Sequence, residues 1–253
     1  MNPATLVYLS QDRAFADYVK EGLEYHNIEL SQAQQFIDVL IDGTVALVFV
    51  DGAHDLWRGQ ILAAKNNAAT RRIPICFASD ERDRRAEAVT CGADLALSWS
   101  ELESRIDQII NDHARIPDPA VLNQLACECR QPLPELALAG LHDFNRGEFY
   151  RQHDLFEAQW VKTAGPVRDL YRGILQVGVA YYQIEGDNYR GALKMLQRSV
   201  QWLRPLPDSC QGIDVKQLRR DSTAVRAELQ RLGPERLGEL DRRLLKKLKW
   251  TPT

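Results

Sequence analysis

The chain has 253 residues, of which 45% are hydrophobic and 26% are charged, and its formal net charge is −3 at pH 7. This composition is typical of a soluble globular protein of one or two domains, and the charge excludes a globally basic nucleic-acid-binding protein. No apolar run approaches the roughly 20 residues that span a bilayer, so no membrane partner is expected. The N-terminal residues have neither the basic nor the apolar region of a signal peptide, which predicts a cytoplasmic protein.

The cysteines are odd in number and scattered along the chain. Without a secretion signal they are expected to be reduced thiols. Cys127 and Cys129 form a CxC pair, but no second Cys/His pair lies near them in the sequence to complete a zinc site. We therefore predict no structural zinc. The full set is Cys76, Cys91, Cys127, Cys129 and Cys210.

The first 114 residues alternate between short apolar runs and amphipathic segments. Apolar runs with strand-forming residues predict strands at 5–10, 28–30, 45–51, 73–78 and 93–98. The segments between and after them predict helices at 11–26, 31–42, 56–67, 81–92 and 101–114. Because parallel strands need crossover connections, this alternation predicts an α/β unit with a five-stranded parallel sheet and helices on both faces.

Residues at the expected strand ends resemble those of a response-regulator receiver domain. Asp51 ends the third strand, Ser79 follows the fourth, and the run 92–94, Gly-Ala-Asp, precedes the fifth. The resemblance covers residues 4–114 of the expected first domain, 1–114, and implies a flavodoxin-like (βα)5 fold with strand order 2-1-3-4-5. It also implies that Asp51 occupies the phosphoacceptor position and Ser79 that of the hydroxyl switch.

The match departs from the receiver pattern at the charged positions. The acidic pair falls at Ser10 and Gln11, which leaves Asp12 as the local carboxylate, and the lysine falls at Trp99. Magnesium requires carboxylate oxygens, and phosphoryl transfer requires a metal and a cation to neutralise charge. The sequence therefore predicts a phosphorylation-independent pseudo-receiver with at most weak magnesium binding at Asp12 and Asp51. A working phosphoacceptor at Asp51 is the alternative.

A proline-rich segment, 115–133, is predicted to be a linker, with a short helix inside it. Beyond it the helical period dominates, and no convincing strand is found in residues 134–253. Gly and Pro residues separate six expected helices. These lie at 134–147, 148–163, 167–185, 188–206, 214–232 and 234–250. The second half is therefore predicted to be an all-helical bundle.

Three blocks in this half resemble the all-helical family called domain of unknown function 309. They are FNRGEFYRQHDLFEAQW, YRGILQVGVAYYQ and GDNYRGALKML. The resemblance runs from about residue 136 to 229 and implies a fold, but it implies no reaction.

The first block places His153 and Glu157 four residues apart, on one face of the expected helix. One hypothesis buries them with Arg168 or Arg172, while Trp160 packs beside them. In that reading Asn145 and Asn188 shape the helix connections. The other hypothesis makes His153 and Glu157 a ligand or metal site, with further candidates at Asp154, Gln176 and Gln183. A catalytic zinc needs three protein ligands, so the buried network is favoured and no metal is predicted.

The last expected helix carries a leucine stripe beside a basic run with Lys246, Lys247 and Lys249. It predicts a homodimer through the stripe. Binding of nucleic acid through the basic face is an alternative.

The fusion of a receiver-like half to a helical half predicts a regulatory adaptor that acts through protein contacts and is not an enzyme. Two alternatives remain open. One is a ligand-binding, metal-binding or hydrolytic helical domain centred on His153 and Glu157 and controlled by the receiver. The other is a nucleic-acid-binding regulator.

Overall fold

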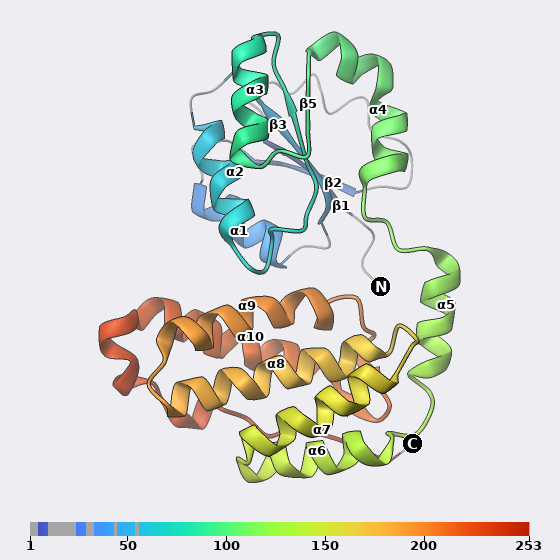
Figure 1. Cartoon of the computed structure of the whole chain (residues 1–253), viewed down its shortest axis with the longest axis vertical. Coiled ribbons are helices and arrows are strands. Elements are labelled where there is room, and N and C mark those ends of the chain that lie inside the picture. The colour runs from blue at the N-terminus through green and yellow to red at the C-terminus, as the bar shows by residue number, and fades with distance from the viewer. Residues whose placement is uncertain (1–4, 10–23, 29–32, 43–44, 54–55, 253) are drawn as a thin grey trace. The chain divides into compact units, whose positions relative to one another are not determined.

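The structure is a computed structural model that describes residues 5–9, 24–28, 33–42, 45–53 and 56–252. The chain divides into two compact units, Met1–Ile116 and Pro117–Thr253, which we call the N-terminal and C-terminal units. Figure 1 shows the sheet in the first unit and the bundle in the second. In the described part of the chain, no helix is long and apolar enough to cross a membrane.

The N-terminal unit contains a parallel sheet. Its strands are β1 (Thr5–Leu9), β2 (Glu24–Ile28), β3 (Val45–Asp51), β4 (Ile75–Ala78) and β5 (Leu95–Leu97), in the order β2-β1-β3-β4-β5. Every neighbouring pair is parallel. The predicted helix 11–26 is wrong at its end, because Glu24 to His26 pair with β1 as part of β2. Its residues 11–23, and Asp12 with them, lie outside the described residues.

Helices cover the sheet of the N-terminal unit in two layers. They are α1 (Ala33–Asp42), α2 (Trp57–Asn66), α3 (Arg82–Cys91) and α4 (Trp99–His113). Successive residues of a strand point to opposite faces. Val48 and Val50 accordingly share a core with side chains of α1, α2 and α3, whereas Leu47 and Phe49 share one with α4. Figure 1 shows α4 on one side of the sheet and α1, α2 and α3 on the opposite side. The apolar run 45–51 is therefore buried on both faces.

The C-terminal unit is mainly helical, as predicted. Its helices are α5 (Pro119–Glu128), α6 (Glu135–Arg146), α7 (Phe149–Lys162), α8 (Arg168–Glu185), α9 (Tyr189–Leu203) and α10 (Val215–Leu232). Helix α8 lies between α7 and α9 (Figure 1), and most of its apolar residues are buried. The helix connection at Gly147 needs a left-handed backbone, with φ at 82°, and it ends α6 where the sequence predicts.

The proline-rich segment 115–133 is more than a linker. Helix α5 occupies its middle, and Leu125 and Cys129 belong to the core of the C-terminal unit. Cys129 forms a disulfide with Cys210, 81 residues further along the chain. The prediction of five reduced thiols is wrong for this pair, because folding brings together two cysteines that show no relationship in sequence. Cys76, Cys91 and Cys127 are free.

The C-terminal unit also contains a small hairpin that the sequence pattern does not predict. Strands β6 (Ser209–Cys210) and β7 (Ile213–Asp214) pair antiparallel. Between them, Gln211 and Gly212 have positive φ angles of 50° and 78°. Two successive residues with positive φ are typical of the tight turns that close two-residue hairpins. The strands are too short to produce a recognisable alternating pattern.

The predicted last helix, 234–250, is wrong. Two short 3-10 helices, η2 (Pro234–Glu239) and η3 (Arg242–Leu244), replace its first part. We call residues 240–252, which follow η2 and include η3, the tail. Leu240 and Leu248 are buried in the core of their own unit. The leucine stripe is therefore not a free surface through which a homodimer could form, and the homodimer itself stays a prediction.

Candidate functional site

The carboxyl edge of the sheet brings Asp51 and Ser79 together. Asp51 pairs with Ala78 across β3 and β4, and Ser79 follows directly. Both residues are buried, at 7% and 5% exposure. Contact across the two strand ends is close, because a Cβ added at Gly52 would lie 2.7 Å from the Cβ of Ser79. The two predicted receiver positions on described residues are therefore adjacent, as parallel strand ends require.

Hydrogen bonds already engage the polar atoms of this edge. One carboxylate oxygen of Asp51 accepts the backbone N–H of Ala53 at 2.8 Å. The Ser79 hydroxyl oxygen accepts the N–H of Glu81 at 3.2 Å. Trp99, at the expected lysine position, begins α4 and donates its backbone N–H to the Asp80 carboxylate at 3.2 Å. The side chain at that position brings no positive charge to the edge.

Two arginines of α3 reach the same edge and were missed in the sequence analysis. Arg84 donates to the carbonyl oxygen of Gly52, and Arg85 donates to that of Ser79, both at 2.6 Å. Each contact is made by a long side chain to the backbone of a strand end. No spacing rule in the sequence marks such a contact, although both arginines lie in the first turns of the helix that follows Ser79.

Helix α7 does not bury the pair His153 and Glu157 as a network. Its buried face is formed by Phe149, Gln152, Phe156 and Gln159. Glu157 is exposed, and the ring Nδ1 of His153 lies 3.1 Å from a carboxylate oxygen of its neighbour Asp154. The prediction of a buried ion-pair network is therefore wrong. Among the described residues, no three His, Cys, Asp or Glu side chains gather in a group that would hold a metal ion.

The predicted arginines instead stack on tryptophans. The guanidinium carbon of Arg172 lies 4.7 Å from the ring centroid of Trp160 and 3.8 Å from that of Trp202. Arg168 lies 5.3 Å from the Trp160 centroid. Cation–π contacts of this kind contribute about 0.5–2 kcal/mol each. Trp160 thus packs between α7 and α8 as expected, while Trp202, which completes the stack from α9, was missed.

The two asparagines of the predicted cluster hold chain connections. Asn188 caps α9, because its side-chain oxygen accepts the N–H of Gly191 at 2.9 Å. Asn145 holds the tail instead: it donates to the carbonyl oxygen of Leu248 at 3.0 Å and accepts its N–H at 2.7 Å. Asn188 therefore shapes a helix connection as predicted. Asn145 has a role that sequence spacing did not reveal, since its partner lies 103 residues away.

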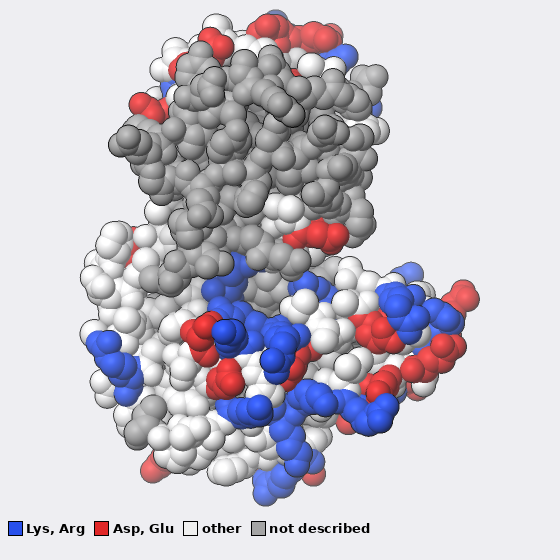
Figure 2. All heavy atoms as spheres, turned by 180° about the vertical axis from the view of Figure 1, so that it is seen from behind, with Lys and Arg blue, Asp and Glu red and all other residues white. Residues whose placement is uncertain are grey.

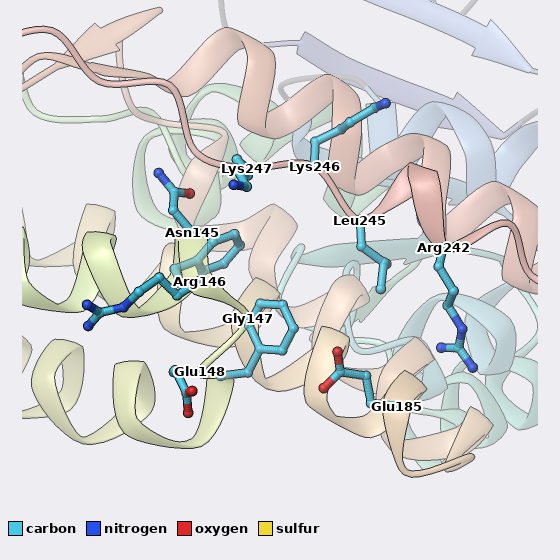
Figure 3. Close-up of a pocket in the computed structure, with 11 residues that line it drawn as sticks. Asn145, Arg146, Gly147, Glu148, Glu185, Arg242, Leu245, Lys246 and Lys247 are labelled. Carbon is cyan, nitrogen blue, oxygen red and sulfur yellow. The ribbon is translucent and has the colours of Figure 1, made fainter.

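A pocket of about 870 Å³ lies beside Asn145, between the α6–α7 connection and the tail. We call it the tail pocket. Its apolar lining comes from Phe144, Phe149 and Leu245, and Asn145 and Gly147 add polar atoms. Figure 3 shows Arg242 beside Glu185, and Lys247 beside Asn145. Its charged lining residues are Arg146, Glu148, Glu185, Arg242, Lys246 and Lys247.

In the sequence, the lysines of the tail pocket belong to the basic face of an expected helix. Their proximity to the α6–α7 connection depends on the tail folding back along the bundle. Partial loss of water around the Glu185 carboxyl raises its pKa, and the nearby Arg242 acts in the opposite direction. His153, Glu157 and Trp160 are not part of this pocket.

Comparison with known proteins places the family resemblance inside the C-terminal unit. An uncharacterized protein of Aquifex aeolicus (strain VF5) is 23% identical over 86 residues, which are 34% of this chain. The chain thus spans about a quarter, 26%, of that relative's length. Residues 138–195 match the family model described as "Domain of unknown function (DUF309)". The matched residues include Asn145 and Trp160 but not the tail, so the chain carries a DUF309 domain to which the tail adds one wall of the pocket.

Proposed function

We propose that the protein is a regulatory adaptor in which a receiver-like N-terminal unit works without phosphorylation, through protein contacts, on the attached helical unit. Two features support a receiver-like, flavodoxin-type unit. The strand order β2-β1-β3-β4-β5 is the order of that class. Asp51 and Ser79 lie at adjacent carboxyl ends, where such folds place their sites.

The proposal rests on the hydrogen bonds that the side chains at the carboxyl edge of the sheet already make. Asp51 and Ser79 already accept backbone N–H groups, and the guanidinium groups of Arg84 and Arg85 are directed to backbone carbonyl oxygens. A phosphoryl group on Asp51 would need cations to neutralise its charge. With Trp99 in place of lysine, the cations that the described residues bring to this edge are Arg84 and Arg85, and both already contact backbone carbonyl oxygens. We therefore infer that the edge serves as a fixed scaffold.

The test is exposure of the full chain to acetyl phosphate and magnesium, followed by the intact mass. We expect no stoichiometric gain of a phosphoryl group. Asp80→Asn is a matched control for Asp51→Asn, because Asp80 lies at the same edge and is exposed. Magnesium-dependent labelling that survives in the Asp80→Asn variant and disappears in the Asp51→Asn variant would reject the phosphorylation-independent function.

The adaptor function itself needs a second measurement in cells. Proximity labelling from the tagged full chain should give the same neighbouring proteins for the wild type and for the Asp51→Asn variant. A set of neighbours that changes with Asp51→Asn would show that the carboxylate controls the contacts. The absence of any reproducible protein neighbour would reject the adaptor.

The two other functions receive less support from the described residues. A metal or hydrolytic centre at His153 and Glu157 lacks further ligands, since Glu157 is exposed and no metal-binding group is found among these residues. A basic helix for nucleic acid is replaced by the 3-10 turns and the tail. Figure 2 shows Lys and Arg side chains on one face of the C-terminal unit, but Asp and Glu side chains are interspersed among them.

A further inference from the structure

Two tyrosines on the outside of the helical bundle contact each other instead of packing into the core. Helices α7 and α8 lie side by side (Figure 1), and the rings of Tyr150 and Tyr182 have their centroids 6.1 Å apart. The two residues are 67% and 47% exposed. In residues 134–252, all of which the structure describes, the other exposed large hydrophobic residue is Val161, at 69%. All three lie on α7 and α8, and such a concentration of exposed apolar side chains is typical of an interaction surface.

Tyr150 and Val161 belong to one exposed row of residues along α7. Residues separated by four, three and four positions share one face of a helix, so Tyr150, Asp154, Glu157 and Val161 follow one another. All four are exposed, and we call them the α7 stripe. The stripe extends over about 16 Å, or about three helical turns. It is apolar at its two ends and acidic in the middle.

The acidic middle of the α7 stripe has no lysine or arginine partner among the described residues. Glu157 forms no ion pair within 4 Å with any of them. The ion-pair partner of Asp154 is His153, which is charged only when it is protonated. Arg151, a nearby cation of the same helix, lies 3.7 Å from the carboxylate of Asp143 instead. The stripe therefore presents two carboxylates whose charge is not neutralised by a permanent cation.

We propose that the α7 stripe, together with Tyr182, binds a basic amphipathic segment of a partner protein. Lysine or arginine side chains of that segment lie at Asp154 and Glu157, and its apolar side chains lie at the tyrosines and at Val161. This partner class rests on the proposed adaptor function, which requires protein contacts, and it assigns those contacts a surface.

The chemistry of the α7 stripe favours a cationic partner for two reasons. Carboxylates form charge-assisted hydrogen bonds with lysine and arginine, and the face of a tyrosine ring attracts the same cations. Tyrosine is also among the residues that contribute most to protein interfaces. Complementary charge speeds association and disfavours acidic segments. Nucleic acid is disfavoured by the same two carboxylates.

Fluorescence anisotropy with the full chain tests the proposal at near-physiological salt. The probes are two labelled helical peptides of equal length. One is built from leucine, alanine and arginine, and in the other glutamate replaces every arginine. We expect the arginine peptide to bind at one site per chain and the glutamate peptide not to bind.

The carboxylates are tested by neutralising both of them. Asp154→Asn combined with Glu157→Gln should weaken binding of the arginine peptide by about three- to tenfold. Glu103→Gln combined with Asp112→Asn removes the same two charges from exposed positions of α4 and should change affinity by less than about twofold. Equal weakening by the two double variants would show a general charge effect and overturn the site.

The tyrosines are tested by removing and by keeping their rings. Tyr150→Ser combined with Tyr182→Ser should weaken binding by about tenfold or more, as expected for interface residues of this type. The matched pair Tyr150→Phe and Tyr182→Phe keeps both rings and should stay within about threefold of the wild type. Unchanged affinity of the serine variant would overturn the role of the aromatic pair.

Two further outcomes would overturn the proposal. One is failure of the arginine peptide to bind at about 100 μM protein, or equal binding of the glutamate peptide. The other is a dimer of the wild type in light scattering that becomes a monomer when Asp154 and Glu157 are neutralised. That result would assign the α7 stripe to a second copy of the chain.

Proximity labelling in cells separates this proposal from the adaptor function. We expect protein neighbours of the wild type to be lost when Asp154 and Glu157 are neutralised, and to be kept in the α4 double variant. Neighbours that persist in both double variants would leave the adaptor function standing and would overturn the α7 stripe as its contact surface.

Discussion

At the scale of single residues, the position of a side chain around its helix determines whether it is buried, and this applies to His153 and Glu157. Glu157 is exposed, whereas the preceding residue, Phe156, is completely buried. We expect Glu157→Ala to change the free energy of unfolding by less than about 0.5 kcal/mol, the usual scale of surface substitutions. Phe156→Ala, on the same turn, should cost about 3–5 kcal/mol because it empties a packed site.

Urea unfolding of the full chain, followed by circular dichroism, measures both variants. Phe156→Ala serves as the positive control for a buried position on α7. A cost above about 1 kcal/mol for Glu157→Ala would exceed what exposed side chains contribute and would restore the buried network.

Single residues also show what a sequence can reveal. The receiver resemblance assigns Asp51 to the end of one strand and Ser79 to the position after another, and the structure places the two strand ends side by side. Arg84 and Arg85 could not be assigned to this edge, because long side chains reach backbone atoms that no periodicity specifies. The burial of Glu157 was predicted wrongly for a different reason. Consecutive helix residues are rotated by about 100°, so His153 and Glu157 share a face, but their spacing does not say whether that face or the face of Phe156 is buried.

At the scale of elements, the tail shows how tertiary contacts override a helical pattern. Leucines at helical spacing predict a helix over 234–250, but Asp241 caps a separate 3-10 turn by accepting the N–H of Arg243. After that turn, Asn145 takes both backbone polar groups of Leu248, which a continuous helix would need for itself. The local sequence around Leu248 does not indicate this contact, because Asn145 lies 103 residues away.

The Asn145 contact gives a prediction about this element. Asn145→Ala leaves an N–H and a carbonyl group of Leu248 without their side-chain partner, and such losses cost about 1–3 kcal/mol. The tail should detach more often, so trypsin should cleave after Lys246, Lys247 and Lys249 faster than in the wild type. Mass spectrometry of the time course identifies the cleavage sites.

Asn188→Ala is the matched control for Asn145→Ala. It removes the cap of α9 at a cost of about 1 kcal/mol, yet it does not touch the tail. Its cleavage after the three lysines should match the wild type. Equal protection of the tail in both variants would show that the Asn145 contact does not hold it.

The disulfide joins two elements that the sequence leaves unrelated, α5 and the β6–β7 hairpin. A cross-link that closes a loop of this length stabilises a protein by about 2–5 kcal/mol, mainly by restricting the unfolded chain. We expect a variant with both Cys129→Ala and Cys210→Ala to lose stability within this range in urea. A reductant should likewise lower the stability of the wild type in urea, and it should leave the stability of the variant unchanged. Wild-type stability that is indifferent to reductant would contradict the bond.

At the scale of the whole molecule, the division into two units was visible in the change from α/β alternation to helices. The predicted end of the first unit, residue 114, lies two residues from the observed division at Ile116. The start of the second unit was not visible, because prolines in 115–133 are typical of linkers. Leu125 and Cys129 belong to the core only through contacts with distant residues.

The start of the C-terminal unit gives the last prediction, which compares the fragments 117–253 and 134–253. The shorter fragment lacks Leu125, the disulfide from Cys129, and Glu128, whose carboxylate accepts the N–H of Val167 at the start of α8 at 2.9 Å. We expect 117–253 to unfold in urea in one cooperative transition and 134–253 to unfold at a lower urea concentration. Fragment 117–253 carrying Cys129→Ala isolates the disulfide and should lie between them, because it keeps Leu125 and Glu128. Equal midpoints for the two fragments would show that α5 is a linker after all.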